Sequence, residues 1–136
     1  MAKVISILGD KISTDFIYPD KYLSITDPTK TPQYAFADDK VLNAQLVNKI
    51  PTESIALVSG MDFGCGIQRI QAVTALKGHN LVVIAKSVSS AYKSECVKLG
   101  FVPIVCPTLS ADVDDELEIQ TFKVINKTRN IEYPRI

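Results

Sequence analysis

The stretch Ser54–Val105, SIALVSGMDFGCGIQRIQAVTALKGHNLVVIAKSVSSAYKSECVKLGFVPIV, decides the fold of this chain. It contains three short apolar runs with the length of buried strands, at residues 54–60, 81–86 and 101–105. The middle run, LVVIAK, is rich in β-branched residues and does not alternate, which predicts that both of its faces are covered. Pro103 lacks a backbone N–H, so the third strand should lie at an edge of the sheet or at a bulge.

Two helical segments separate these strands. The first is predicted from about Ile67 to Lys77 and is closed by Gly78. The second follows a group of serines of the kind that cap helix N-termini, and it ends at Gly100. This order of elements predicts a β-α-β-α-β unit with three parallel strands and right-handed crossovers.

The rest of the chain adds elements on both sides of this unit. Residues 2–8 alternate as a strand, and residues 12–18 are interpreted as a second short extended run. A surface loop rich in Pro, Thr and Asp is expected over residues 27–40, followed by a short helix over residues 39–49. The alternating stretch ELEIQTFKVI, residues 116–125, predicts one half-solvated strand that pairs antiparallel with a neighbour. The expected fold class is α/β with a mixed sheet.

Length and composition place residues 1–136 in a single domain. Apolar residues make up 46% of the chain, and 15 basic side chains balance 15 acidic ones, as in an ordinary globular protein. Lys and Arg are dispersed, so no nucleic-acid partner is expected. No apolar run reaches the roughly 20 residues that span a bilayer, and no secretory signal is recognised. We therefore expect no membrane association and a cytoplasmic location.

The candidate metal ligands do not form a recognisable site, and no metal is predicted on this chain. Cys65, Cys96 and Cys106 contain no CxxC pair and are expected to be free thiols. The acidic run from Asp112 to Glu118 precedes an exposed strand and is interpreted as a solvated face. His79 lies in a loop and is expected at the surface.

The loop DFGCGIQRI, residues 62–70, is the first candidate functional site. It should open at the carboxyl end of a strand, where ligands of open α/β sheets bind. Gly64, Cys65 and Gly66 can bring backbone N–H groups close to an anion, and Arg69 can add a bidentate grip on a carboxylate. The alternative is that the glycines only make a tight turn and the arginine covers a surface. The loop matches neither GxGxxG nor a Walker loop.

Two separated blocks carry a resemblance to a known family. Residues 60–105, with GMDFGCGIQRI, ALKG, VIAKS and FVPI in order, resemble the small subunit of 3-isopropylmalate dehydratase and the swivelling domain of aconitase. In that family a strand leads into Gly-x-Asn-Phe-Gly-Cys-Gly-Ser-Ser-Arg-Glu. Residues 9–23, GDKISTDFIYPDKYL, are similar to the family's Gly-Asp-x-x-x-Thr-Asp-x-Ile-x-Pro followed by Tyr-Leu. The resemblance implies a swivelling β/β/α domain.

The resemblance also implies an activity and partners. Family members dehydrate and rehydrate hydroxy di- and tricarboxylic acids, with a four-iron, four-sulfur cluster as the Lewis acid. The large subunit or the large domains bind that cluster, so no cofactor is expected on this chain and Cys65 is not expected to be an iron ligand. The implied partners are a large iron–sulfur subunit and a small carboxylic acid substrate.

Particular residues match the family's functional positions. Arg69 matches the arginine that binds a substrate carboxylate, and Asp15 matches an aspartate that supports the active site by hydrogen bonding. Tyr22, Leu23 and Ser24 match the specificity loop, where some relatives carry an arginine that grips a distal carboxylate. Ser24 supplies no such charge, so a substrate of this protein need not carry that extra carboxylate.

The chain departs from the family at the catalytic base. The two serines are replaced by Ile67 and Gln68, and the glutamate that follows the arginine is replaced by Ile70. An aliphatic side chain cannot accept a proton, and positioned acid–base groups contribute roughly 10²–10⁴-fold to rate. Two hypotheses follow. Either the chain is the small subunit of a hydro-lyase or isomerase with an altered base, or it is a non-catalytic swivel-domain protein that serves as a binding, regulatory or assembly partner.

Overall fold

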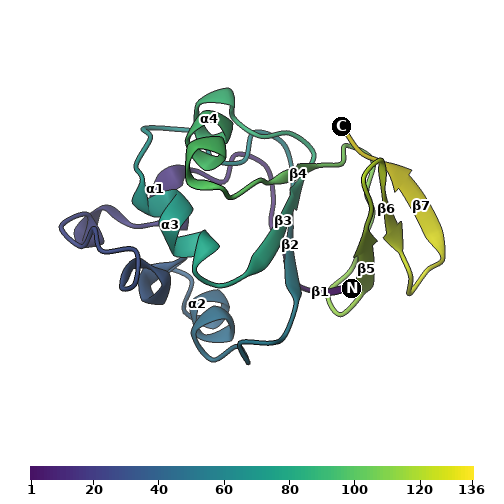
Figure 1. Cartoon of the computed structure of the whole chain (residues 1–136), viewed down its shortest axis with the longest axis horizontal. Helices are drawn as coiled ribbons and strands as arrows, with labels where there is room; N and C mark the ends of the chain where they lie inside the picture. Colours follow the sequence, from purple (N-terminus) through teal and green to yellow (C-terminus); the bar gives the residue numbers. More distant parts are fainter.

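A computed structural model describes all 136 residues, and its elements follow the predicted order closely (Figure 1). The helical elements are α1 (Thr14–Ile17), α2 (Lys40–Val47), α3 (Gln71–Lys77) and α4 (Ser90–Leu99), with two 3-10 turns, η1 (Asp20–Tyr22) and η2 (Thr31–Tyr34). The strands are β1 (Ala2–Ile7), β2 (Ile55–Ser59), β3 (Leu81–Ala85), β4 (Ile104–Val105), β5 (Glu116–Ile119), β6 (Lys123–Asn126) and β7 (Ile131–Pro134). No helix has the length and apolar character that crossing a membrane requires.

The seven strands form one mixed sheet in the order β4-β3-β2-β1-β5-β6-β7. Strands β1 to β4 are parallel to one another, and β5, β6 and β7 are antiparallel to their neighbours. The predicted β-α-β-α-β unit is therefore confirmed as β2-α3-β3-α4-β4. Its last strand lies at the sheet edge, where the missing N–H of Pro103 costs no ladder hydrogen bond.

The sheet separates two apolar cores, because alternate residues of its central strands point to opposite faces. The helices cover one face, and β5–β7 curve round the other (Figure 1). On β2, Ile55 and Leu57 pack with the helices, whereas Ala56 and Val58 pack toward β5 and β6. All five residues of β2 are buried, as the non-alternating runs predicted. The layers are strand, strand and helix, which confirms the expected α/β fold class.

Two helix starts differ from the prediction. Residues 12–18 contain the helical turn α1 rather than an extended run, because the Ser13 hydroxyl caps it by accepting from the Phe16 N–H at 3.1 Å. Helix α3 begins at Gln71, four residues later than predicted. The residues before it follow Gly66, whose φ of +95° breaks the helical path.

The C-terminal prediction of a single strand over residues 116–125 is wrong. The chain reverses at Thr121 and Phe122 to form the hairpin β5–β6, and β7 adds a third strand that was not predicted. The antiparallel pairing of β5 with β1 is confirmed. The last residue returns to the opposite edge of the sheet, where the Ile136 N–H donates to the Val105 carbonyl at 2.9 Å. One hydrogen bond thus links β4 to the end of β7 and nearly closes the sheet on itself.

Candidate functional site

The two sequence blocks that carry the resemblance lie side by side in the structure. Residues 9–14 run along residues 60–67 and are joined to them by backbone hydrogen bonds: Gly60 N–H to Gly9 O, Lys11 N–H to Met61 O, Gly64 N–H to Ile12 O and Thr14 N–H to Cys65 O. Their lengths are 2.7–3.0 Å. The Thr14 hydroxyl also donates to the Ile67 carbonyl at 2.5 Å. The glycine loop is therefore shaped by the N-terminal block as much as by its own residues.

Both glycines of the loop have left-handed backbone conformations, with φ of +82° at Gly64 and +95° at Gly66. A side chain at Gly64 would also collide with its surroundings, because an ideal Cβ would lie 2.3 Å from the ring of Tyr92. That ring is fully buried, and its hydroxyl donates to the Ala72 carbonyl at 2.7 Å. A Cβ at Gly66 would meet nothing closer than 3.7 Å. At position 64 both the packing against Tyr92 and the backbone conformation require a glycine. At position 66 only the backbone conformation requires one.

The backbone of residues 65–69 offers free hydrogen-bond donors. None of these five N–H groups donates to a protein acceptor. The Gln68 side chain instead holds the loop closed by donating from Nε2 to the carbonyls of Gly64 and Gly66, at 3.0 and 3.1 Å. Free backbone donors in a glycine turn can take up an anion. Since α3 starts only at Gln71, the loop itself and not a helical first turn supplies these donors.

The Arg69 side chain is 90% buried and is held by three groups of the N-terminal block. Its Nη1 donates to the Tyr18 carbonyl at 3.1 Å and to Asp20 Oδ1 at 2.5 Å, and it lies 3.5 Å from Asp15 Oδ1. Its Nε is buried without a hydrogen-bond partner, and Nη2 makes no hydrogen bond within the chain. Nη1 is therefore used internally and Nε is enclosed by the protein, which leaves Nη2 as the guanidinium nitrogen that a ligand can reach.

Asp15 lies beside the arginine, and it does two things there. Its Oδ1 lies within salt-bridge distance of Arg69 and also accepts from the Asp20 backbone N–H at 3.2 Å. Asp20 itself was not singled out from the sequence, although it makes the shortest contact with the guanidinium. It follows Pro19 in a turn, and an aspartate in such a turn carries no signal of its long-range partner.

The segment that matches the specificity loop lies against the same arginine-bearing region. The Gln71 side chain donates to the Leu23 carbonyl at 2.9 Å, and the ring of Tyr22 stacks on Tyr34 with centroids 4.3 Å apart. Ser24 is exposed and makes no side-chain hydrogen bond. These contacts fix the backbone of residues 22–24 close to the start of α3. No feature of the residues around Gln71 indicated that its side chain would be buried for this purpose.

Two of the three departures from the family pattern, Ile67 and Ile70, place exposed apolar side chains in the loop. Ile67 is 82% exposed, and Ile70, Leu23 and Met61 are exposed as well. Ile67 thus presents a bare aliphatic side chain at the position where the resemblance places a proton acceptor. Its own carbonyl is occupied by Thr14. The titratable residues that the loop does contain, Asp62, Cys65 and Arg69, leave position 67 itself without a proton acceptor.

The other titratable residues lie away from this site. His79 is half-buried rather than a surface residue; its Nε2 lies 2.6 Å from the Pro32 carbonyl, and burial lowers its pKa. Burial raises the pKa of Cys96 to about 12. In the acidic run, Arg129 pairs with Asp112 and Asp115, which gives these carboxylates a structural role.

Comparisons with individual proteins and with solved structures agree on the family. A comparison with family models finds no match. The chain is 33% identical over 129 residues to the 3-isopropylmalate dehydratase small subunit of Caldicellulosiruptor saccharolyticus, with 91% of this chain and 72% of the relative covered. It is 33% identical over 136 residues to the methanogen homoaconitase small subunit of Methanocaldococcus jannaschii, with 93% and 76% covered.

A solved structure shows the same architecture. The crystal structure of a 3-isopropylmalate dehydratase from Methanocaldococcus jannaschii superposes with a TM-score of 0.86 at 28% identity, covering 99% of this chain and 80% of that one. The layered sheet and the joined blocks thus define a swivelling β/β/α domain of the aconitase superfamily. Within that class, the chain belongs to the family of 3-isopropylmalate dehydratase small subunits.

Proposed function

We propose that this chain is the small subunit of a hydro-lyase or isomerase that acts on a hydroxycarboxylic acid together with a large iron–sulfur subunit. The observation that carries the proposal is the joint between the N-terminal block and the glycine loop, which presents five free N–H groups beside a buried arginine. Such an arrangement suits a small carboxylate, because backbone donors and a guanidinium both stabilise negative charge. Relatives named as dehydratase and homoaconitase small subunits support this reading.

The cluster is proposed on the partner because this chain offers no ligand set for it. No three His, Cys, Asp or Glu side chains come together, and Cys96 and Cys106 are buried in separate cores. When bound by the large subunit, a four-iron, four-sulfur cluster supplies a Lewis acid for the substrate hydroxyl. The task left to this chain is to bind and orient a carboxylate and to keep water away from it.

The substrate must compete with Asp20 for the arginine. The Asp20 side chain is 71% exposed, so it can move out into solvent, whereas the guanidinium that it pairs with is 90% buried. A substrate carboxylate can displace Asp20 from Nη1, and Nη2, which makes no hydrogen bond within the chain, can then serve as its second donor. Asp15 remains to hold the guanidinium in place. Ile67 cannot move a proton, so the base must come from the large subunit or from another residue of this chain.

Turnover by the reconstituted two-subunit complex tests the proposal. The complex is assayed with a panel of hydroxy di- and tricarboxylic acids, using wild-type chain, Arg69→Ala and the matched control Arg129→Ala. We expect Arg69→Ala to reduce kcat/KM by about 10²-fold or more, because a charged contact to the substrate is lost. Arg129→Ala should leave kcat/KM unchanged. Equal turnover by the wild type and Arg69→Ala would refute the assigned role.

The exposed Ile67 favours a second candidate, a non-catalytic swivel-domain protein that binds or assembles a partner. An 82% exposed isoleucine cannot transfer a proton, and with the exposed Ile70 of the same loop it offers apolar area to a partner. Restoring both serines in Ile67→Ser/Gln68→Ser discriminates between the candidates. On this second reading the restored protein gives no turnover with any large subunit. A clear gain of activity would count against it.

A further inference from the structure

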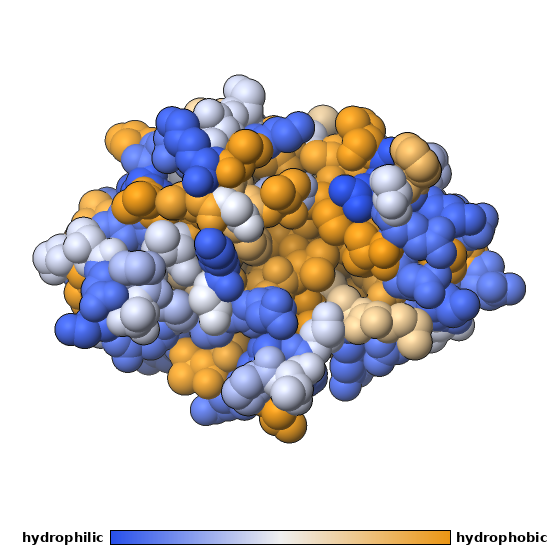
Figure 2. All heavy atoms as spheres, in the orientation of Figure 1, coloured by the Kyte–Doolittle hydropathy of each residue, from blue (hydrophilic) through white to orange (hydrophobic).

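The face of the sheet that carries no helices is hollowed. A cavity of about 460 Å³ opens between the parallel strands and the segment Cys106–Ala111 that leads from β4 toward β5. Figure 2 shows it as an apolar hollow between the parallel half of the sheet and β5–β7. Val58, Ile84 and Leu109 form a nearly buried floor, and the 45% exposed Ile7 lies at the rim. The core on this side is therefore not fully closed.

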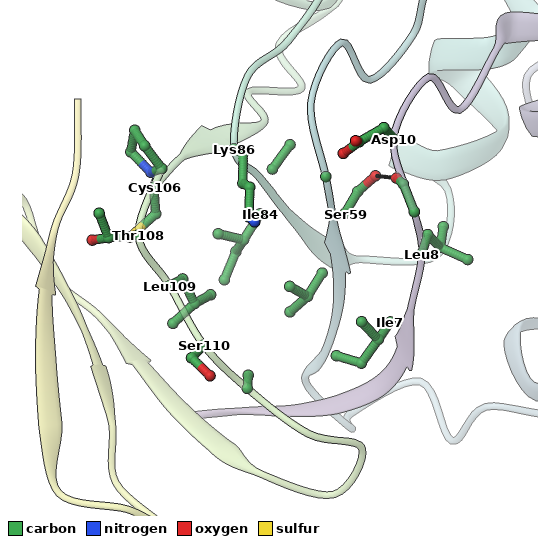
Figure 3. A pocket seen from close by; sticks show the side chains of 16 residues that line it. Ile7, Leu8, Asp10, Ser59, Ile84, Lys86, Cys106, Thr108, Leu109 and Ser110 are labelled. Carbon is green, nitrogen blue, oxygen red and sulfur yellow. Dashed lines mark hydrogen bonds between the residues drawn. The ribbon is translucent and has the colours of Figure 1, made fainter.

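Few polar side chains line the cavity, and three of them make no hydrogen bond or salt bridge within the protein. Lys86 is the one cation among the sixteen lining residues, and it makes no salt bridge and no side-chain hydrogen bond. Figure 3 shows its side chain directed into the cavity from the end of β3. The hydroxyl groups of Thr108 and Ser110 on the opposite wall also have no partner in the protein. The single anion, Asp10, already accepts from the Met61 N–H at 2.7 Å.

The cavity has the position and the size of a ligand-binding site. The cavity lies at the carboxyl ends of β1, β2 and β3, where ligands of α/β sheets bind. Its volume is within the range of about 300–1,000 Å³ that small-molecule pockets occupy. Arg69, Asp15 and the loop residues 62–70 are all absent from its wall, and it meets the joint only at Gly9, Asp10 and Gly60.

We propose that this cavity binds a small monocarboxylate with an aliphatic chain. The carboxylate pairs with the Lys86 ammonium, and the chain lies on the floor made by Val58, Ile84 and Leu109. An apolar floor with one free cation at its rim matches such a molecule in both charge and shape. A dicarboxylate would place its second charge against the apolar floor, where desolvation opposes it.

The site adjoins the segment that shapes the glycine loop. Asp10 and Gly60 belong to the cavity wall, and both hold the start of the loop: Asp10 through the Met61 N–H, and Gly60 through its own N–H to Gly9 O at 3.0 Å. Gly60 and Asp10 are packed so closely that no side chain fits at position 60, because a Cβ there would lie 1.9 Å from Asp10 Oδ1. The proposed ligand therefore touches the framework of the loop without touching the loop itself.

Titration of the ¹⁵N-labelled full chain with hexanoate tests the proposal. Hexan-1-ol and hexylamine serve as neutral and charge-reversed probes of the same length. We expect hexanoate to shift the backbone amides of Gly60, Met61, Lys86 and residues 108–111 saturably, with hexanol weaker and hexylamine weakest. Lys86→Gln should raise the Kd for hexanoate about tenfold or more and leave hexanol unchanged. Lys127→Gln, which removes another exposed and unpaired lysine, should change neither.

A second variant addresses the floor independently of the charge. Ser110→Phe places a ring over the cavity and should abolish binding of both hexanoate and hexanol. Hexanoate binding that is absent, or unaffected by Lys86→Gln, would overturn the proposal. The same titration is repeated on the assembled complex. If the hexanoate shifts were lost there and the large subunit could be cross-linked to the cavity wall, a protein segment would be the occupant, and the proposal would be overturned. Binding is first measured on the free chain, so failure here leaves the turnover test of the proposed function untouched.

Discussion

Replacing Gly64 by alanine is predicted to destabilise the fold more than any other glycine-to-alanine change in the loop. Its φ of +82° costs an alanine about 1–2 kcal/mol. The added Cβ would also lie 2.3 Å from the buried Tyr92 ring, and overpacking of that kind costs about 1–3 kcal/mol. The sum is about 2–5 kcal/mol, a large part of the stability of about 5–15 kcal/mol that a single domain has.

Two other glycines provide matched controls. Gly66→Ala meets the same conformational cost without the collision, since its φ is +95° and no atom lies within 3.7 Å of its Cβ. We expect a loss of about 1–2 kcal/mol there. Gly9→Ala meets nothing within 4 Å and has no positive φ, so its effect should be near zero.

Equilibrium urea unfolding of the three variants, followed by far-UV circular dichroism, measures these differences. The free energies of unfolding should decrease in the order Gly9→Ala, Gly66→Ala, Gly64→Ala, at a common m-value. If Gly64→Ala were as stable as Gly66→Ala, the close packing of the loop against Tyr92 would be refuted. A normal stability for both would refute the left-handed conformation of the whole turn.

Three further outcomes follow from buried groups. Tyr92→Phe removes the hydrogen bond to the Ala72 carbonyl and should lower the free energy of unfolding by about 0.5–1.5 kcal/mol in urea, with no change in fold. Burial lowers the pKa of His79 in the folded chain, so the unfolded state binds more protons. Stability should therefore fall as the pH drops below the ordinary value of about 6.5, and His79→Gln should flatten that slope. The pKa of Cys96 is raised to about 12 by burial and Cys106 is buried, whereas Cys65 is partly exposed. A thiol reagent at pH 8 should label one cysteine in the native chain and three in urea; fast labelling of all three in the native chain would contradict the burial.

The sheet could be predicted from sequence because its signals are local. The buried strands β2 and β3 are continuous apolar runs, and the glycines after the two helices mark where they end. The C-terminal hairpin was missed because its turn is Thr121-Phe122, without the Gly or Asn that usually marks a two-residue turn. The Phe122 side chain is 82% exposed at this turn, although the residue is apolar.

The site could be predicted only in part, because sequence patterns do not show which distant groups will meet. The loop and Arg69 are recognisable from their own residues, and the resemblance placed Asp15 at the active site without naming Arg69 as its partner. Asp20, Thr14 and Gln71 contact partners about 50 residues away in the sequence. The residues next to them in the sequence therefore do not indicate these contacts. The late start of α3 is likewise set by the φ of Gly66, which amphipathic periodicity does not encode.

The joint between residues 9–14 and 60–67 also has a consequence for the order in which the protein folds. Its hydrogen bonds join segments that are roughly 50 residues apart in the chain. Bringing such distant segments together loses chain entropy before the new contacts can compensate for it. The β-α-β-α-β unit can form from nearer neighbours first. The hydrogen-bonded amides of the joint, those of Lys11, Thr14, Gly60 and Gly64, should therefore gain protection from exchange among the last in the molecule, and the loop should take its binding conformation only after the amino-terminal residues have docked.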